Sequence, residues 1–155
     1  MKFKQSLIEN DSILLNASAE DWQSAIKLGT DMLEKTGAIT ANYYQAIIKA
    51  VDTLGPYIIL APNLAMPHAR PEDGVNCTAF ALVTLKTPVY FPSEDDPVDV
   101  LITLAGSSSD EHIAILQEVT QVLDDESSET GINLDRIRTC KNKYDIYQVI
   151  DESLK

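Results

Sequence analysis

The sequence predicts an α/β layered domain, with a central mixed β-sheet flanked by helices on both faces. Two near-continuous apolar runs, Cys77–Leu85 and Val98–Ala105, are typical of central strands that are covered on both faces. Around them, apolar residues recur at helical spacing. The chain has 155 residues, of which 45% are hydrophobic, which is enough for one compact core. We therefore expect a single domain over residues 1–155.

Two amphipathic helices are expected before the first strand. Ser18 and Asp21 resemble a capping box, and the helix that follows should end at Gly37. Thr40 is expected to cap a second helix, which Gly55-Pro56 closes. The expected apolar stripes are Trp22, Ala25, Ile26, Gly29, Met32 and Leu33 in the first helix, and Tyr44, Ile47, Ile48, Val51 and Leu54 in the second. Such a pair favours a helical hairpin.

The remaining elements follow in order. A short apolar run, Tyr57 to Leu60, and the two longer runs are expected to be strands. Ser108 with Glu111 forms another capping-box pattern, and a helix should continue from it to Leu123. The acidic, serine-rich stretch from 124 to 131 reads as an exposed loop. Apolar residues after it predict one or two closing helices: Leu134, Ile137, Ile146, Val149 and Ile150.

Charge and targeting signals exclude several classes of function. A formal charge of −12 disfavours nucleic acids and anionic membranes as partners and favours a basic macromolecule. The start MKFKQSLIEND has no apolar signal region, and no run approaches the roughly 20 apolar residues of a membrane span. We therefore expect a cytoplasmic protein without membrane insertion. Cys77 and Cys140 lack metal-ligand spacing, so neither a disulfide nor zinc is predicted.

The chain has two histidines, and both are candidates for chemistry. His68 lies in the proline-rich segment 61–71 between two predicted strands, where the prolines stiffen the loop around the imidazole. Arg70 next to it could pair with phosphate oxygens. His112 lies in the first turn of a capped helix, a position that favours anions and a neutral imidazole. Taken alone, each histidine could equally be an ordinary structural residue.

The segment from Leu64 to Arg70, Leu-Ala-Met-Pro-His-Ala-Arg, resembles the Ile-Ala-Ile-Pro-His-Gly signature of the mannitol/fructose-type IIA proteins of the bacterial phosphotransferase system. In that family the signature histidine accepts a phosphoryl group, and a later histidine at a helix start assists it. His68 and His112 match this order and spacing. The resemblance covers nearly the whole chain and implies the mannitol-type IIA fold.

Within this family the chain looks most similar to the ascorbate-specific type. That likeness rests on 55–57 (Gly-Pro-Tyr), 64–68 (Leu-Ala-Met-Pro-His), 70–72 (Arg-Pro-Glu) and 43–47 (Tyr-Tyr-Gln-Ala-Ile). Two departures stand out. Asp52 occupies the place of the family's active-site arginine, so either Arg70 replaces it or the site lacks a guanidinium. Asn63 and Ala69 stand where glycines are usual, and Asn63 tolerates a positive φ better than Ala69 does.

The resemblance implies a role as phosphoryl carrier. His68 would receive the phosphoryl group from the histidine-containing phosphocarrier protein HPr and pass it to a IIB component, which serves the membrane permease IIC. His112 would stabilise the phosphoryl group, and Arg70 could contact it. No metal or cofactor is required, and the absence of a P-loop or kinase motif argues against direct use of a nucleotide. We expect an open, shallow site ringed by Met66 and Pro67, which docks proteins rather than free sugar.

Other functions stay open at this point. The chain could be a regulatory phosphohistidine protein of the nitrogen-type IIA class, which is not coupled to transport. It could also be an interaction domain in which His68 is structural. A IIB role is disfavoured, because neither Cys77 nor Cys140 lies in a small-residue phosphate loop. The transported sugar, the reactive ring nitrogen of His68 and the oligomeric state are not determined by the sequence.

Overall fold

The computed structural model describes residues 2–125, 127 and 131–153. Within them, five strands form one mixed sheet in the order β1-β4-β5-β3-β2. The strands are β1 (Ile13–Ala17), β2 (Ile59–Ala61), β3 (Leu64–Ala65), β4 (Ala79–Val89) and β5 (Val98–Ala105). The central pair β4 and β5 is antiparallel, whereas β1 pairs with β4, and β3 with β5, in parallel. Both long apolar runs are therefore central strands, as predicted.

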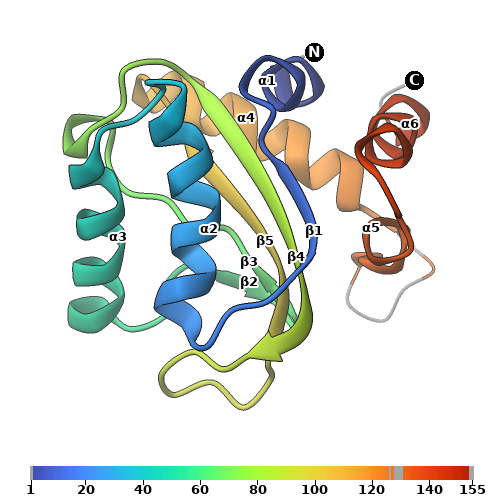
Figure 1. Ribbon diagram of the computed structural model, residues 1–155, viewed down its shortest axis with the longest axis horizontal. Coiled ribbons are helices and arrows are strands. Elements are labelled where there is room, and N and C mark those ends of the chain that lie inside the picture. Colours follow the sequence, from blue (N-terminus) through green and yellow to red (C-terminus); the bar gives the residue numbers. More distant parts are fainter. Residues whose placement is uncertain (1, 126, 128–130, 154–155) are drawn as a thin grey trace.

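Helices cover both faces of this sheet (Figure 1). The helical elements are α1 (Lys2–Asn10), α2 (Trp22–Lys35), α3 (Ala41–Leu54), the 3₁₀ turn η1 (Pro71–Asp73), α4 (Ser109–Leu123), α5 (Asp135–Arg138) and α6 (Lys143–Ser153). The pair α2 and α3 lies on one face, and α1, α4, α5 and α6 lie on the other. The predicted α/β layered class and the helical hairpin are confirmed. No helix within the described ranges has the length and apolar character needed to cross a membrane.

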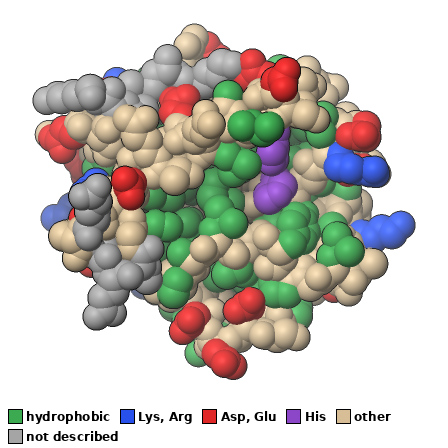
Figure 2. Space-filling model, turned by 180° about the vertical axis from the view of Figure 1, so that it is seen from behind, with side chains coloured by type: hydrophobic (Ala, Val, Ile, Leu, Met, Phe, Trp, Pro, Cys, Tyr) green, Lys and Arg blue, Asp and Glu red, His purple; other side chains and the backbone are tan. Residues whose placement is uncertain are grey.

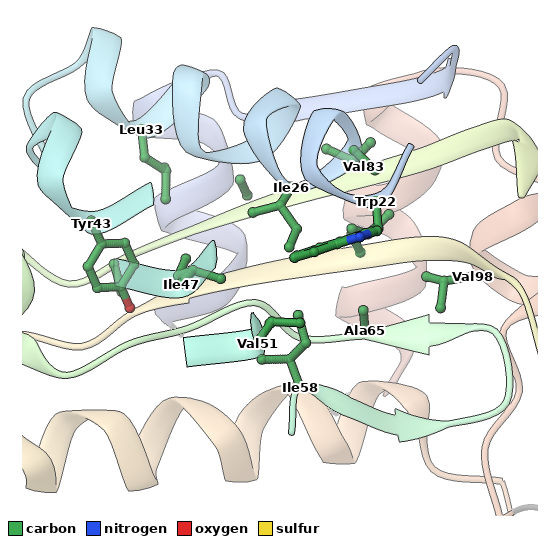
Figure 3. Close-up of a cluster of buried hydrophobic side chains, with 14 of the residues drawn as sticks. Trp22, Ile26, Leu33, Tyr43, Ile47, Val51, Ile58, Ala65, Val83 and Val98 are labelled. Atoms are coloured by element: carbon green, nitrogen blue, oxygen red, sulfur yellow. The ribbon is translucent and has the colours of Figure 1, made fainter. Parts of the chain in front are cut away.

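The first face, covered by α2 and α3, supplies one wall of the site. Trp22, Ile26 and Leu33 from α2 pack with Ile47 and Val51 from α3 against the sheet (Figure 3). Burying each such side chain contributes roughly 1.5–3 kcal/mol. The expected stripe of α3 is wrong at Leu54, which is 73% exposed, and it omitted Tyr43, which is fully buried. Tyr44 is partly buried and packs against this core, as expected. Consequently α3 presents its last turn to solvent.

Several boundaries differ from the sequence-based expectation. The segment 2–17, for which no element was predicted, forms α1 and β1. Asp21, rather than Ser18, is the N-cap of α2 and accepts a hydrogen bond from the Ser24 N–H at 2.8 Å. Thr40 is the N-cap of α3 by position, but its side chain makes no capping hydrogen bond. The run Tyr57 to Leu60 enters the sheet only from Ile59 onward.

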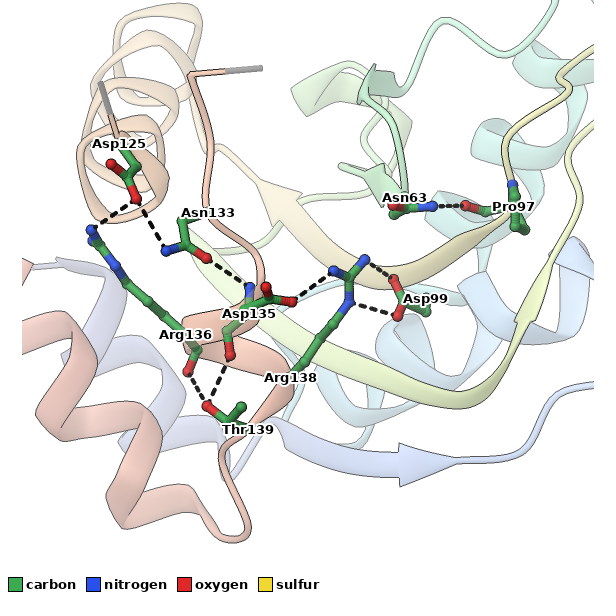
Figure 4. Close-up of polar contacts among 9 residues, drawn as sticks. All are labelled: Asn63, Pro97, Asp99, Asp125, Asn133, Asp135, Arg136, Arg138 and Thr139. Atoms are coloured by element: carbon green, nitrogen blue, oxygen red, sulfur yellow. Dashed lines mark hydrogen bonds and ion pairs between the residues drawn. The ribbon is translucent and has the colours of Figure 1, made fainter. Parts of the chain in front are cut away.

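A tight turn joins β2 to β3 just ahead of the histidine loop. Asn63 takes a φ of 74°, as its tolerance for positive φ suggested, and its side-chain N–H donates to the Pro97 carbonyl at 2.7 Å (Figure 4). Ala69 keeps a negative φ. The short β3 strand is thereby set against β5, and the chain leaves β3 directly into the segment that holds His68.

Ion pairs fix α5 beside the amino end of β5. Arg138 makes a bidentate contact with Asp99, with Nε and Nη2 at 2.7 and 2.8 Å from the two carboxylate oxygens (Figure 4). Arg138 also contacts Asp135 at 3.2 Å, and Arg136 contacts Asp125 at 3.6 Å. Part of the predicted acidic loop lies outside the described residues. Asp125 and Ser127, which follow α4 in the chain, are among the described residues.

Candidate functional site

Backbone hydrogen bonds fix the loop that holds His68 on both of its sides. The Met66 N–H donates to the Ile58 carbonyl at 2.8 Å, and the Leu104 N–H donates to the Pro67 carbonyl at 2.9 Å. Pro67 adds a fixed φ immediately before the histidine. The loop is thus an extension of the β3–β5 pairing, and it holds His68 near the carboxyl end of β5.

One ring nitrogen of His68 makes a hydrogen bond to the backbone, and the other has a lone pair available for reaction. Its Nδ1 lies 2.6 Å from the Met66 carbonyl oxygen. A carbonyl only accepts hydrogen bonds, so in the neutral ring Nδ1 holds the proton and Nε2 retains a lone pair. Desolvation by burial lowers the pKa of His68, although the hydrogen bond to Met66 acts in the opposite direction. The ring is therefore neutral and nucleophilic at neutral pH.

His112 approaches His68 from the first turn of α4. Ser108 caps this helix by accepting a hydrogen bond from the Glu111 N–H at 3.2 Å, as the capping-box pattern predicted. The two imidazole centroids lie 5.0 Å apart, with the rings inclined at 54°. Burial, and then the proximity of His68, lowers the pKa of His112. A neutral His112 can donate one N–H to an anion held beside it.

A glycine makes this approach possible. Gly106 lies between β5 and α4, and a Cβ built on it would stand 2.9 Å from the His112 Cα. Real Cβ atoms do not come that close to backbone, so any larger residue would push the start of α4 away. The short distance between the two histidines thus depends on a glycine at position 106.

The histidines line a cleft of about 450 Å³ between α3, the His68 loop and α4. Its lining residues are Ala46, Ala50, Leu54, Tyr57, His68, Ala69, Arg70, Pro71, Asp73, Ser109, His112 and Ile113. Figure 2 shows the two histidine side chains at the surface among hydrophobic side chains, with acidic groups toward the edges of that face. The apolar surroundings were predicted, but their source was not. Met66 is 1% exposed and packs in the core, and Pro67 is also buried, so neither rings the cleft.

Arg70 lies at the rim of this cleft and is engaged with a carboxylate. Its side chain is 74% exposed and pairs with Asp73 at 3.3 Å. Among the described residues that line the cleft, it alone bears a permanent positive charge. Asp52 is exposed on α3 and does not line the cleft. The described residues contain no cluster of three or more His, Cys, Asp or Glu side chains that could hold a metal ion.

Two tyrosines complete the site, and reasoning from the sequence assigned them no role. The Tyr57 hydroxyl donates to the carbonyl of His68, and its ring stands edge-on to the imidazole at 5.2 Å. The Tyr43 hydroxyl donates to the Leu104 carbonyl at 2.6 Å and accepts a hydrogen bond from the Ala69 N–H at 3.0 Å. Periodicity could indicate that α3 is buried, but no local signal shows that its tyrosine reaches the histidine loop.

Known proteins resemble this chain in sequence and in fold. Residues 6–153 match the family model described as phosphoenolpyruvate-dependent sugar phosphotransferase system, EIIA 2. The ascorbate-specific PTS system EIIA component of Shigella boydii serotype 4 is 46% identical over 99% of this chain and 97% of its own length.

Two solved structures extend the comparison. The mannitol-specific cryptic phosphotransferase enzyme IIA of Escherichia coli superposes with a TM-score of 0.84 at 35% identity, over 98% of this chain and 99% of that one. The mannitol IIA in a complex with phosphorylated IIB, also from Escherichia coli, gives a TM-score of 0.75 at 26% identity, over 92% and 95%. The chain therefore belongs to the EIIA type 2 family of the phosphoenolpyruvate-dependent sugar phosphotransferase system, whose members are phosphoryl-transferring components of sugar transport.

Proposed function

We propose that this chain, as a single domain over residues 1–155, accepts a phosphoryl group on Nε2 of His68 and passes it on. The observation that supports this most directly is the 2.6 Å contact between His68 Nδ1 and the Met66 carbonyl. It holds the proton on Nδ1 and leaves the Nε2 lone pair for attack. The ring also lines the cleft, where a partner protein can present phosphorus.

The chemistry is two in-line displacements at phosphorus. The Nε2 lone pair of His68 attacks the phosphorus of a phosphohistidine on HPr, and the broken P–N bond returns its electron pair to the donor imidazole. A cysteine thiolate of a IIB protein then attacks the same phosphorus, and that P–N bond returns its pair to His68 Nε2. The proton on Nδ1 stays in place throughout, so His68 emerges ready for another cycle.

His112 and Arg70 are the groups that we expect to meet the phosphoryl charge. His112 lies beside His68 and, as a neutral ring, can donate an N–H to a phosphoryl oxygen without a permanent charge that would trap the phosphate. Arg70 must leave Asp73 to make such a contact, so its contribution should be smaller than that of His112. With Asp52 off the cleft, the site relies on these two groups.

Partners and substrate follow from relatives rather than from the cleft alone. We propose HPr as donor and a IIB protein as acceptor, in the cytoplasm, with IIB supplying the membrane permease IIC. The identity of 46% to an ascorbate-specific component favours L-ascorbate as the transported compound. A IIA protein need not touch that compound, so specificity is expected to lie in the choice of IIB.

Reconstituted transfer tests the proposal. Phosphoenolpyruvate, purified enzyme I and HPr are mixed with the wild type, with His68→Ala and with His112→Ala, and the intact mass is recorded over time. We expect one added phosphoryl group on the wild type, none on His68→Ala and slow addition to His112→Ala. A wild type that gains no mass contradicts the carrier role.

The choice of acceptor separates transport from regulation. The phosphorylated chain is offered an ascorbate-type IIB protein and, as control, a mannitol-type IIB protein. Transfer to the ascorbate-type protein should be the faster of the two. A phosphoprotein that gives its phosphoryl group to neither would favour the regulatory alternative of the nitrogen-type class.

A further inference from the structure

Tyrosine hydroxyls hold both polar groups of the peptide that joins His68 to Ala69. The carbonyl of this peptide, which belongs to His68, accepts a hydrogen bond from the Tyr57 hydroxyl. Its N–H, which belongs to Ala69, donates to the Tyr43 hydroxyl at 3.0 Å. The two tyrosines come from different places, one from within α3 and one from the turn after it. Rotation of this peptide would break both bonds together.

The two hydroxyls are themselves fixed. Tyr43 is fully buried, and Figure 3 shows its ring among the core side chains between α3 and the sheet. Its own proton goes to the Leu104 carbonyl at 2.6 Å, which leaves the oxygen free to accept from Ala69. Tyr57 is partly buried against the His68 ring, with the two rings inclined at 83°. Burial raises the pKa of Tyr57 to about 12, so its hydroxyl keeps the proton that it donates.

The Tyr43 hydroxyl also connects the segments that hold the two histidines. Leu104 is near the end of β5, and the chain continues from it through Gly106 into the cap of α4. Gly106 packs against the backbone of His112. One buried oxygen is therefore bonded to the His68 loop on one side and to the strand that leads to His112 on the other.

We propose that Tyr57 and Tyr43 are positioning residues for phosphoryl transfer, which act by fixing the peptide after His68 so that its ring keeps Nδ1 on the Met66 carbonyl and Nε2 in the cleft. This inference rests on the proposed role of His68. With the peptide free to turn, the ring would leave Met66 part of the time and populate the tautomer in which Nε2 holds the proton. That tautomer cannot attack phosphorus through Nε2.

The test compares Tyr57→Phe and Tyr43→Phe with Tyr44→Phe. Tyr44 is the matched control, because it is on the same helix as Tyr43 and its hydroxyl also donates to a backbone carbonyl, that of Gln23, at 3.3 Å. The readouts are the ring ¹⁵N shifts of His68 in the unphosphorylated protein, and kcat and KM for phosphorylated HPr. For Tyr57→Phe we expect the ring shifts to move toward those of a tautomer mixture, and kcat to fall about tenfold or more with KM little changed. Tyr44→Phe should match the wild type.

Tyr57→Phe is the deciding variant, since Tyr43→Phe also leaves a core carbonyl without its donor and can lower stability by that route. Wild-type ring shifts and wild-type kcat in Tyr57→Phe would overturn the proposal and mean that water replaces the hydroxyl. Because the ring shifts are recorded without phosphate, they test the positioning even if the wild type proves unable to accept a phosphoryl group. A wild type that cannot accept a phosphoryl group would instead overturn the proposed function.

Discussion

At the scale of single residues, the protonation state of His68 decides whether the chain can accept a phosphoryl group. Burial lowers the pKa of His68 below its ordinary value of 6.5. The acid limb of the rate of phosphoryl acceptance should therefore be centred below pH 6.5. A pH–rate profile with phosphorylated HPr measures this. A limb centred above pH 6.5 would contradict the assignment.

The same shift has a consequence for stability. A histidine whose pKa is lower in the folded than in the unfolded chain is protonated first in the unfolded chain as the pH falls. Both His68 and His112 have lowered pKa values. Their titration therefore leaves the free energy of unfolding at its full value above pH 6.5 and lowers it progressively below pH 6.5. Urea unfolding across this range should show less loss of stability in a His68→Gln/His112→Gln variant than in the wild type. An equal acid dependence in the two proteins would mean that other groups cause it.

His112 is expected to accelerate transfer rather than to receive the phosphoryl group. Replacing it by alanine removes a donor aimed at the transferred group, and loss of such a donor typically costs about 10²–10³ in rate. A quenched time course of phosphorylation, recorded for His112→Ala and for Arg70→Gln, compares the rates of the two variants and checks the ranking of the two groups. Arg70→Gln should lose less, because Arg70 already pairs with Asp73. A larger loss in Arg70→Gln would reverse the assignment.

Single residues also show where reasoning from sequence succeeds and fails. The settings of His68 and His112 could be predicted, because a stiff proline-rich loop and a capping box are local patterns, whereas their candidate roles came from the family resemblance. Tyr43 and Tyr57 could not, because their contacts join residues far apart in the chain through hydroxyl groups. Met66 was expected at the rim because it precedes His68. Its side chain instead packs in the core on the sheet face that α1, α4, α5 and α6 cover, while the histidine faces the cleft.

At the scale of elements, the spacing of α4 from the end of β5 sets the distance between the histidines. Gly106→Ala places a Cβ 2.9 Å from the His112 Cα, so the start of α4 must move. We expect a loss of about 1–3 kcal/mol in the free energy of unfolding, together with slower transfer.

Gly29→Ala is the matched control for this variant. Its Cβ would stand 2.6 Å from the Thr103 Oγ1, between α2 and the sheet and away from the cleft. Gly29→Ala should cost stability while the folded protein transfers at the wild-type rate. Equal transfer rates in the two variants, measured below their unfolding temperatures, would show that the position of α4 does not matter.

The contact between α5 and β5 should affect stability alone. Arg138 donates two hydrogen bonds, of 2.7 and 2.8 Å, to the carboxylate of Asp99, and a lysine cannot reproduce a bidentate contact. Arg138→Lys is therefore expected to lower the free energy of unfolding by about 1–2 kcal/mol without slowing phosphoryl transfer. Urea unfolding and the transfer assay together check this. A slower transfer rate would indicate that α5 acts on the site.

Elements were predictable in proportion to the length of their pattern. The helices α2, α3 and α4 and the strands β4 and β5 follow from sustained periodicity and clear ends. The segment 2–17 was missed because α1 buries little more than Phe3 and Leu7, and β1 is a short edge strand with alternating exposure. Such elements gain their stability from packing on β4 and α4, which local sequence does not record.

At the scale of the whole molecule, an acidic protein presents an apolar cleft to its partners. The formal charge is −12, whereas the exposed side chains of Leu54 and Ile113 lie at the cleft itself. Attraction of a basic partner should weaken as salt rises, and the apolar contact should persist. Titration of HPr at increasing NaCl is expected to show a rising Kd. A Kd independent of salt would contradict the electrostatic part of this account.

Substitution of an apolar residue that lines the cleft tests the apolar part of partner binding separately from the charge. Ile113 is 56% exposed at the cleft, and Tyr144 is 68% exposed on α6. Ile113→Glu should weaken partner binding about tenfold or more, since it buries a charge in the centre of the contact, and Tyr144→Glu should not. Both variants add the same charge, so equal loss in the two would mean that net charge alone governs docking.

The phosphoryl group is expected on Nε2 of His68, and ¹⁵N–³¹P coupling in the phosphorylated, ¹⁵N-histidine-labelled protein measures its position. His68→Ala identifies which ring gives the signal. We predict coupling to Nε2 of His68 alone, with Nδ1 still protonated against the Met66 carbonyl. Coupling to Nδ1, or to a ring nitrogen of His112, would contradict the account.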